Sequence, residues 1–341
     1  MLMKTKESVT TENAPIRILV IAGPTAVGKT AFALEAAKRY GGEIVSCDSM
    51  QIYRYMDIGS AKPTKEEREE VPHHLVDCID PLDMAGEGSF SAARYAALAS
   101  EAIEDIHQRG RLPVIVGGTG LYLNALLYEM DFGSTGSDPA LRAELSGIAE
   151  EEDGPRKLHD MLRKKDPAAA ERIHPNNVKK VIRALERLMG GEESLQSFEE
   201  IQQENPRYAP LMVGLTRNRQ ELYERINDRV LQMMEDGLVE EVRTLESMGL
   251  SEQNIAILGI GYKECLPLLR EECSPEETTD LIQKNTRHLA KRQLTWFRRY
   301  DKIVWFDISD YDDEKQALEA IFAWLDPKLS NCITEATNRI T

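Results

Sequence analysis

Short apolar runs alternate with stretches of helical periodicity along the first third of the chain. Apolar runs rich in β-branched residues occupy 14–23, 43–49 and 112–118. Between them, residues 30–40 and 89–110 carry apolar side chains at the three- and four-residue spacing of a helix. Buried strands that alternate with helices are typical of a parallel sheet covered on both faces. The pattern therefore predicts an α/β fold.

A long helical stretch interrupts the strand pattern. Residues 124–206 hold several helical patterns and no strand signal, which predicts an all-helical insertion domain. Strand signals return at 211–216 and 302–309, and one long helix is expected over 220–248. The expected parts of the chain are a flexible N-terminus at 1–14, a core domain made of 15–123 and 207–325 with C-terminal helices, the insertion at 124–206, and a tail at 326–341.

Composition narrows the class of protein. The 341 residues are 42% hydrophobic and 29% charged, the balance of a soluble globular protein. No apolar run approaches the ~20 residues of a membrane span, and the polar N-terminus does not read as a secretion signal. Five scattered cysteines without a CxxC pair indicate neither a zinc site nor a disulfide framework. We therefore expect a reduced, monomeric, cytoplasmic protein without a membrane partner.

The sequence GPTAVGKT at 23–30 matches the phosphate-binding pattern GxxxxGK[ST] in full. It lies between a predicted strand and a predicted helix, so backbone amides and the helix N-terminus would together form an anion cradle. Lys29 would add a positive charge, and the Thr30 hydroxyl could ligate Mg²⁺. The residues predicted to bind phosphate are Gly23, Pro24, Thr25, Ala26, Val27, Gly28, Lys29 and Thr30.

The acid that usually accompanies this loop in ATPases is absent from the expected place. A Walker-B strand ends in Asp, whereas the strand at 112–116 is followed by the sequence GGTG. Asp48, just past the second strand, is the nearest substitute, at the sheet edge that also holds the glycine loop. A carboxylate there can act as a general base or hold magnesium through water. A turn or helix-cap role is the simpler alternative for Asp48.

Several motifs together resemble the tRNA dimethylallyltransferases, which prenylate an adenosine of tRNA. The motifs are GPTAVGKT, SCDSMQIY, SAKP, PHHLVD, GGTGLY, DPALR, IHPNNVKKVIRALE, GIGYKE and TRHLAKRQLTWFRR, and the resemblance covers about 16–306. Val27 and Ser60 depart slightly from the family, where serine and threonine are common at these positions. The resemblance implies a P-loop NTPase-like sheet whose loop holds the diphosphate of dimethylallyl diphosphate instead of ATP.

The resemblance also implies the reaction. A dimethylallyl group passes from the diphosphate to the exocyclic amine of the adenosine on the 3′ side of the anticodon, and diphosphate is released. Lys29, Thr30, the loop amides and magnesium would stabilise the leaving group. Asp48 would be the base, and Thr30 and Asp48 are the expected magnesium ligands, the latter through water if need be.

An arginine usually assists such a leaving group, because its planar fork binds phosphate oxygens in pairs. Four candidates follow the returning strand: Arg217, Arg219, Arg225 and Arg229. Arg219, at the expected strand-to-helix turn, is favoured as the catalytic arginine, and Arg225 is second. Each of them could equally be a solvated surface residue.

Two basic segments stand out in a chain of net charge −16. The helix expected at 177–189 places its basic residues, including Arg187, opposite an apolar face, a pattern that a solvated helix surface also shows. Residues 284–302 interleave basic side chains with aromatic ones, which can contact phosphates and unpaired bases. The resemblance implies that the tRNA anticodon stem-loop binds Asp48, Ser49, Met50, Gln51, Thr119, Arg142, Lys179, Lys180, Arg183, Arg287, Lys291 and Arg298.

Other functions stay open at this point. A small-molecule kinase would use the same loop, a prenyltransferase could act on free AMP, and a non-enzymatic module could bind RNA. The basic C-terminal half argues against AMP, and Asp48 beside an intact phosphate loop argues against a mere binding module. The histidines of PHHLVD (72–77) lack a third ligand at useful spacing, so a local packing role is expected for them.

Overall fold

The computed structural model describes residues 14–83, 90–130, 138–192, 194–195 and 203–340. The chain divides into two compact units: the first comprises the described residues of Met1–Leu127 and Pro206–Thr341, and the second those of Tyr128–Asn205. The flexible N-terminus expected at 1–14 falls, except for Ala14, outside the described residues.

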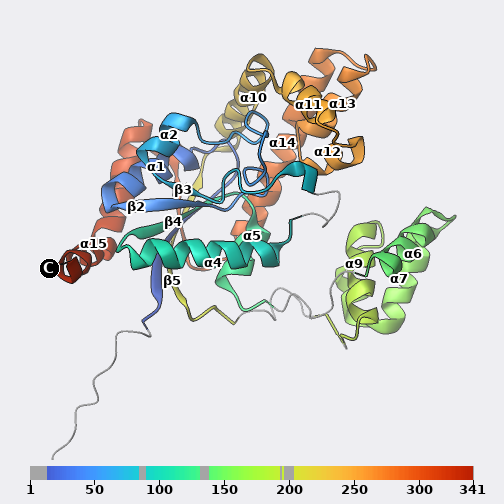
Figure 1. Cartoon of the computed structure of the whole chain (residues 1–341), viewed down its shortest axis with the longest axis horizontal. Coiled ribbons are helices and arrows are strands. Elements are labelled where there is room, and N and C mark those ends of the chain that lie inside the picture. Colours follow the sequence, from blue (N-terminus) through green and yellow to red (C-terminus); the bar gives the residue numbers. More distant parts are fainter. Residues whose placement is uncertain (1–13, 84–89, 131–137, 193, 196–202, 341) are drawn as a thin grey trace, which may run out of the picture. The chain divides into compact units, whose positions relative to one another are not determined.

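A parallel sheet of six strands forms the centre of the first unit (Figure 1). Its order is β3-β2-β4-β1-β5-β6, and each pairing between these strands is parallel. The strands are β1 (Ile16–Ala22), β2 (Gly42–Ser46), β3 (His73–His74), β4 (Leu112–Gly117), β5 (Tyr208–Thr216) and β6 (Ile303–Asp307). The sheet confirms the predicted α/β fold.

The central position of β1 in the sheet explains why most of its residues are apolar. It pairs with β4 on one side and with β5 on the other, and Ile18 to Ala22 are all buried. Because these five residues are covered on both faces of the sheet, the alternation with polar residues is lost from Ile18 onward, whereas Arg17 is exposed.

Helices cover both faces of this sheet (Figure 1). Phe32 of α1 (Lys29–Tyr40) packs against Phe322 of α15 (Glu314–Ile340) with ring centroids 5.5 Å apart. Tyr95 of α4 (Ala92–Gln108) stacks on Tyr122 of α5 (Gly120–Leu127) at 4.4 Å. The helices of the first unit are α1 (Lys29–Tyr40), α2 (Lys65–Glu70), α4 (Ala92–Gln108), α5 (Gly120–Leu127), α10 (Arg219–Glu235), α11 (Leu238–Ser247), α12 (Glu252–Leu258), α13 (Tyr262–Leu269), α14 (Pro275–Phe297) and α15 (Glu314–Ile340).

Two expected elements differ from the structure. The single helix expected over 220–248 is wrong: α10 ends before Gly237, and α11 begins after it. Gly237 has φ of 101°, a left-handed conformation that ends a helix and that glycine adopts at little cost. At the other end of the chain, residues expected as a tail from 326 belong to α15, which runs to Ile340.

The second unit is helical and has its own core. Its helices are α6 (Pro139–Glu150), α7 (Gly154–Lys165), α8 (Pro167–Arg172) and α9 (Val178–Met189). Leu158 and Leu162 of α7 pack with Val181 and Leu185 of α9, and none of the four is exposed. The apolar face expected on α9 is thus buried, while Met189 at its end is exposed. Among the described residues, no helix is both long and apolar enough to span a membrane.

Candidate active site

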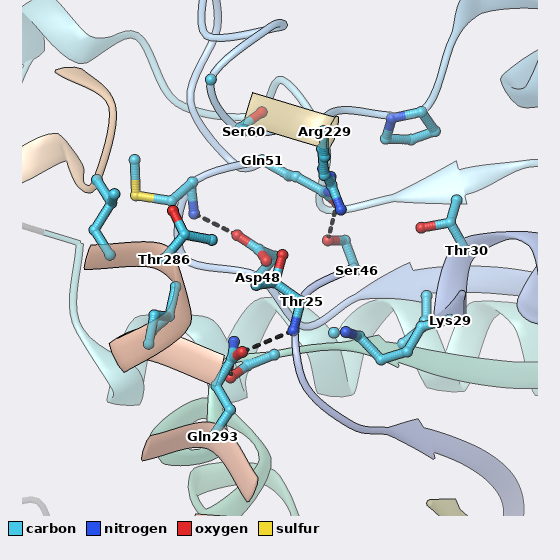
Figure 2. A pocket seen from close by; sticks show the side chains of 18 of the residues that line it. Thr25, Lys29, Thr30, Ser46, Asp48, Gln51, Ser60, Arg229, Thr286 and Gln293 are labelled. Carbon is cyan, nitrogen blue, oxygen red and sulfur yellow. Dashed lines mark hydrogen bonds between the residues drawn. The ribbon is translucent and has the colours of Figure 1, made fainter. Parts of the chain in front are cut away.

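A cavity lies where the loops after β1, β2 and β4 meet at the carboxyl ends of these strands (Figure 2). Thr25, Lys29 and Thr30 enter it from the glycine loop, and Asp48 enters from the loop after β2. Helices α10 and α14 add further side chains to its lining. Crevices at this edge of a doubly wound sheet are the usual ligand sites of the fold.

The glycine loop has the backbone of an anion cradle. Gly23 adopts φ of 150°, and a Cβ there would lie 2.5 Å from the carbonyl oxygen of Leu215, so only glycine fits. The loop closes at Gly28, which precedes the first turn of α1. The backbone amides of that turn point toward the loop and give it a positive potential. The predicted loop residues therefore come together as one loop at the N-terminus of α1.

Lys29 lies inside this cradle and donates from Nζ to the carbonyl of Pro24 at 2.6 Å. Burial and, to a smaller extent, the positive charge of Arg229 lower the pKa of Lys29 to about 7, while Asp48 partly opposes both effects. A bound diphosphate would supply the negative charge that favours the protonated amine. Lys29 and Arg229 thus place two basic groups close together at the glycine loop.

Asp48 sits across the cavity from Lys29 (Figure 2). Its Oδ1 accepts a hydrogen bond from the Met50 amide at 2.9 Å, which fixes the carboxylate in a tight turn. The amide of Ser49 donates to Thr119 Oγ1 at 3.0 Å, so the loops after β2 and β4 are joined beside the carboxylate. The structure therefore brings these two loops together, and Asp48, Met50 and Gln51 line the cavity.

The arginine that faces the cavity is Arg229 of α10, not Arg219 (Figure 2). Arg219 is exposed at the first residue of α10, with its guanidinium 5.1 Å from the centre of the Tyr223 ring. Burial lowers the pKa of Arg229, and the nearby Asp48 carboxylate partly offsets that effect. Ten residues along α10 separate Arg219 from Arg229, which corresponds to about 15 Å of helix and a different helix face. Arg219, the residue favoured from the sequence, therefore does not reach the cavity.

Two further arginines hold the glycine loop from outside. Arg225, the second choice from the sequence, donates to the carbonyl of Ala26 at 3.0 Å, and Arg217 donates to the carbonyl of Val27 at 3.1 Å. Both also pair with Glu314 of α15. Arg225 and Arg229 are four residues apart on one helix, so they share a face. This spacing connects Arg229 with the second choice, Arg225, and was not used in the prediction from the sequence.

Gln293 of α14 is a site residue that sequence reasoning missed. Its Oε1 accepts from the Thr25 amide at 2.9 Å, and its Nε2 donates to the Gly118 carbonyl at 3.1 Å. It thus ties the glycine loop to the glycines that follow β4. Ile282, Thr286 and Leu289 line the cavity with it at spacings of three and four, a helical stripe that could have revealed this face of α14.

The expected magnesium ligands fit the cation. The Thr30 hydroxyl and the Asp48 carboxylate line the same cavity. Both are oxygen donors, and Mg²⁺ prefers a few such ligands completed by water and substrate phosphates. The histidines are used otherwise: His73 Nδ1 lies 2.7 Å from the Val71 carbonyl, and His74 Nε2 lies 2.7 Å from Glu43. Within the described ranges, three or more metal-type side chains do not gather at any one point.

The basic residues expected to bind RNA differ in their surroundings. Lys179, Lys180 and Arg183 of α9 are exposed. Glu186 of the same helix is buried and accepts a two-pronged pair from Arg142, at 2.7 and 2.9 Å. Arg142 is therefore oriented by an ion pair inside the second unit.

The segment at 284–302 is only partly a surface. Lys291 and Arg298 are exposed, whereas Arg287 donates to Asn227 Oδ1 at 2.5 Å. Phe297 and Tyr300 are 1% and 3% exposed, so these two rings serve the core and cannot stack on a base.

Comparisons with known proteins agree with this geometry. The family model described as IPP transferase matches residues 51–300. The tRNA dimethylallyltransferase of Alkaliphilus oremlandii is 47% identical over 305 residues, which cover 89% of this chain and 96% of that protein. The tRNA dimethylallyltransferase of Caldanaerobacter subterraneus subsp. tengcongensis is 44% identical over 317 residues, 92% of this chain and 99% of that protein.

Solved structures show the same likeness. The tRNA isopentenylpyrophosphate transferase from Bacillus halodurans is 44% identical, with a TM-score of 0.66 over 93% of this chain and 98% of that one. A eukaryotic dimethylallyltransferase acting on tRNA is 30% identical, with a TM-score of 0.77 over 93% of this chain and 80% of that one.

Proposed function

This chain belongs to the IPP transferase family, and we propose that it transfers a dimethylallyl group from dimethylallyl diphosphate to tRNA. The acceptor is the exocyclic amine of the adenosine on the 3′ side of the anticodon, and diphosphate is released. One observation carries the proposal: a phosphate loop and a carboxylate, Asp48, line one cavity. The relatives named above argue against the kinase, AMP and binding-module alternatives.

The residues that line the cavity have different roles in the proposed reaction. The amine nitrogen attacks the first carbon of the dimethylallyl group while the bond from that carbon to the diphosphate oxygen breaks. Lys29, Arg229 and the loop amides stabilise the charge that gathers on the leaving diphosphate. Asp48 takes the proton that the amine loses. Magnesium, held by Thr30 and Asp48, would neutralise further charge on the diphosphate.

Labelled dimethylallyl diphosphate tests the proposal when it is incubated separately with tRNA, AMP and ATP. The label should enter tRNA alone. Transfer to AMP would favour the nucleotide prenyltransferase, and phosphate release from ATP that depends on tRNA would favour a kinase or an ATPase.

The exposed stripe on α9 is proposed to contact tRNA phosphates. Replacing Lys179, Lys180 and Arg183 together by Ala should raise the KM for tRNA and leave that for dimethylallyl diphosphate nearly unchanged. The log–log salt slope of tRNA binding should fall by roughly one unit or less for each phosphate that the variant no longer neutralises. Lys65→Ala is the control, because Lys65 is an exposed lysine in the acidic segment KEEREE. An unchanged affinity and slope in the triple variant would show that this face of α9 is only solvated.

A further inference from the structure

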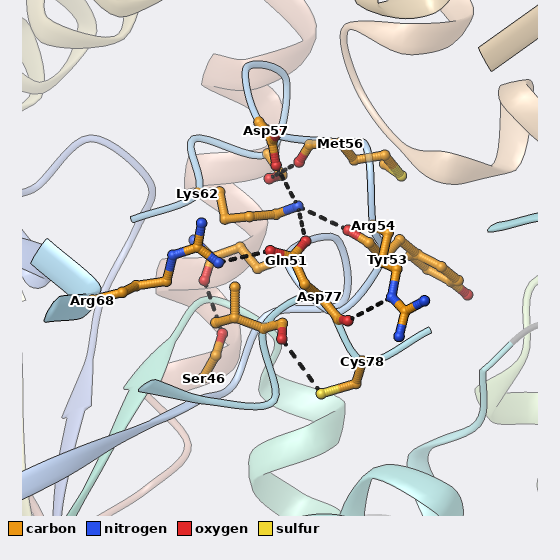
Figure 3. Close-up of polar contacts among 12 residues, drawn as sticks. Ser46, Gln51, Tyr53, Arg54, Met56, Asp57, Lys62, Arg68, Asp77 and Cys78 are labelled. Atoms are coloured by element: carbon orange, nitrogen blue, oxygen red, sulfur yellow. Dashed lines mark hydrogen bonds and ion pairs between the residues drawn. The ribbon is translucent and has the colours of Figure 1, made fainter. Parts of the chain in front are cut away.

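A lysine outside the glycine loop is buried close to the cavity, in the stretch between the lining residues Ser60 and Pro63. The side chain of Lys62, which precedes α2, is only 2% exposed. Its ammonium donates to the carbonyl of Tyr53 at 2.9 Å, to the carboxylate of Asp57 at 2.7 Å and to that of Asp77 at 2.6 Å (Figure 3). Asp77 also pairs with Arg68 of α2 at 2.7 Å.

These contacts decide between two roles for Lys62. A lysine ammonium has three N–H donors and accepts nothing, and the three acceptors use all of them. The buried charge is compensated by two carboxylates, which is the condition under which such a charge is tolerated. Lys62 borders a hollow that it shares with Lys29 and Thr30. Its ammonium is nevertheless occupied by protein acceptors and has no donor left for a substrate phosphate.

The segment that Lys62 holds forms a wall of the cavity. Met50, Gln51, Gly59 and Ser60 line the cavity from this segment. Lys62 ties the part of the chain that carries them, at Tyr53 and Asp57, to Asp77 beyond β3 (Figure 3).

Gln51 is the cavity residue that depends most directly on this arrangement. Its backbone carbonyl accepts from the amide of Asp77 at 3.1 Å. Its side chain accepts from Ser46 Oγ at 2.8 Å and donates to the carbonyl of Ala61 at 3.3 Å. Asp77 and Ala61 are the ion-pair partner and the immediate neighbour of Lys62, so the ammonium supports two of the three residues that orient Gln51.

The backbone around the ammonium is strained. Ala61 has φ of 45° and Asp77 has φ of 57°, values in the left-handed region that residues with a Cβ rarely adopt. Such conformations persist only where the surroundings determine them, and they gather at functional sites. The ion pair between Lys62 and Asp77 joins these two strained points and keeps them in place.

A second anchor also holds the segment that carries the lining residues. Glu241 of α11 accepts from the three successive amides of residues 57–59, at 2.8, 2.8 and 3.0 Å, and from the hydroxyl of Tyr262 at 2.8 Å. This support does not involve Lys62. The segment therefore keeps an anchor when Lys62 is replaced, and a variant is expected to fold with its wall displaced.

We propose that Lys62 is a positioning residue for prenyl transfer, which sets the wall carrying Gln51 against the acceptor base while diphosphate binding depends on other residues. The inference rests on the proposed function. In Lys62→Met, kcat/KM for tRNA should fall roughly tenfold to a hundredfold, the size of effect that a small misplacement of bound groups produces. The Kd for dimethylallyl diphosphate alone should equal that of the wild type.

Arg109→Met is the matched control. Arg109 forms a two-pronged pair with Glu43, whose side chain is also 2% exposed, and neither residue lines the cavity. Each variant removes a cation from a carboxylate that keeps another basic partner, Arg68 for Asp77 and His74 for Glu43. Both should lower the melting temperature, but only Lys62→Met should change the kinetics. A purely structural role for Lys62 predicts equal kinetics in the two variants below their melting temperatures, and that result would overturn the proposal.

Asp77→Asn tests whether Lys62 acts through its ion pair with Asp77. Asparagine tolerates the left-handed backbone of position 77 and keeps an acceptor for the ammonium, so its loss in kcat/KM should be smaller. The double variant should be no worse than Lys62→Met alone, because neighbours in one network are not additive. Additive losses, or a weaker Kd for dimethylallyl diphosphate in Lys62→Met, would overturn the proposal. Failure of the wild-type enzyme to prenylate tRNA would instead contradict the proposed function.

Discussion

Asp48→Asn should lower kcat for prenyl transfer by roughly 10²–10⁴-fold, the usual contribution of a positioned general base. Asparagine keeps the oxygen that accepts from the Met50 amide, so the turn and the cavity should keep their shape. What it loses is the negative charge with which Asp48 would take up the proton of the attacking amine and help to hold magnesium. Single-turnover rates with enzyme in excess over tRNA measure the chemical step, and filter binding should show unchanged tRNA affinity.

Asp80→Asn is a control of the same local geometry. Asp80 Oδ1 accepts from the amide two residues ahead, Leu82, at 2.9 Å, as Asp48 does from Met50, but Asp80 does not line the cavity. It should leave the rate unchanged. A rate for Asp48→Asn within a few-fold of wild type would remove Asp48 from the role of base.

Arg229→Gln should weaken dimethylallyl diphosphate binding and lower kcat by roughly 10²–10³-fold, the cost of losing one well-placed donor to a developing charge. Arg229 lines the cavity beside Lys29 and Asp48, and burial strengthens its field. Steady-state kinetics with varied dimethylallyl diphosphate, together with direct binding of diphosphate, separates the two effects. Affinity for tRNA should not change.

Arg219→Gln is the comparison that this prediction needs. Arg219 belongs to the same helix but is exposed over the Tyr223 ring, so its variant should behave like the wild type. Similar losses in both variants would mean that the general positive charge of α10 matters, and not the position of Arg229.

The glycine loop and Asp48 could be predicted because each lies within a few residues of a strand end. Parallel strands carry such loops to one edge of the sheet, so sequence order alone brings Lys29 and Asp48 into one cavity. The α/β fold is confirmed for the same reason, since central strands such as β1 and β4 are mostly apolar runs. Local pattern and tertiary position agree in this part of the chain. The edge strand β3, which consists of His73 and His74, has no such pattern and was not predicted.

The rest of the site depends on where long helices pass. Arg229 lies far along α10 and Gln293 lies within α14, and no local pattern says which turn of a helix crosses the cavity. Lys62 was visible in the sequence only as part of SAKP, because its partners Asp57 and Asp77 meet it through folded loops. In the helix expected over 220–248, apolar periodicity continued past Gly237, and the backbone of that one residue decided the outcome.

The place of β5 beside β1 matters while the ribosome is still making the chain. The strands β1, β2 and β4 are complete at Gly117, but β5, the second neighbour of β1, begins only at Tyr208, after the helical unit has been translated. Translation adds ~5–20 residues per second, so the edge of β1 that will pair with β5 stays unpaired for roughly 5–20 s. An unpaired apolar edge invites pairing with other chains. The nascent polypeptide is therefore most prone to aggregate, and most in need of a chaperone, during synthesis of residues that take no part in its sheet.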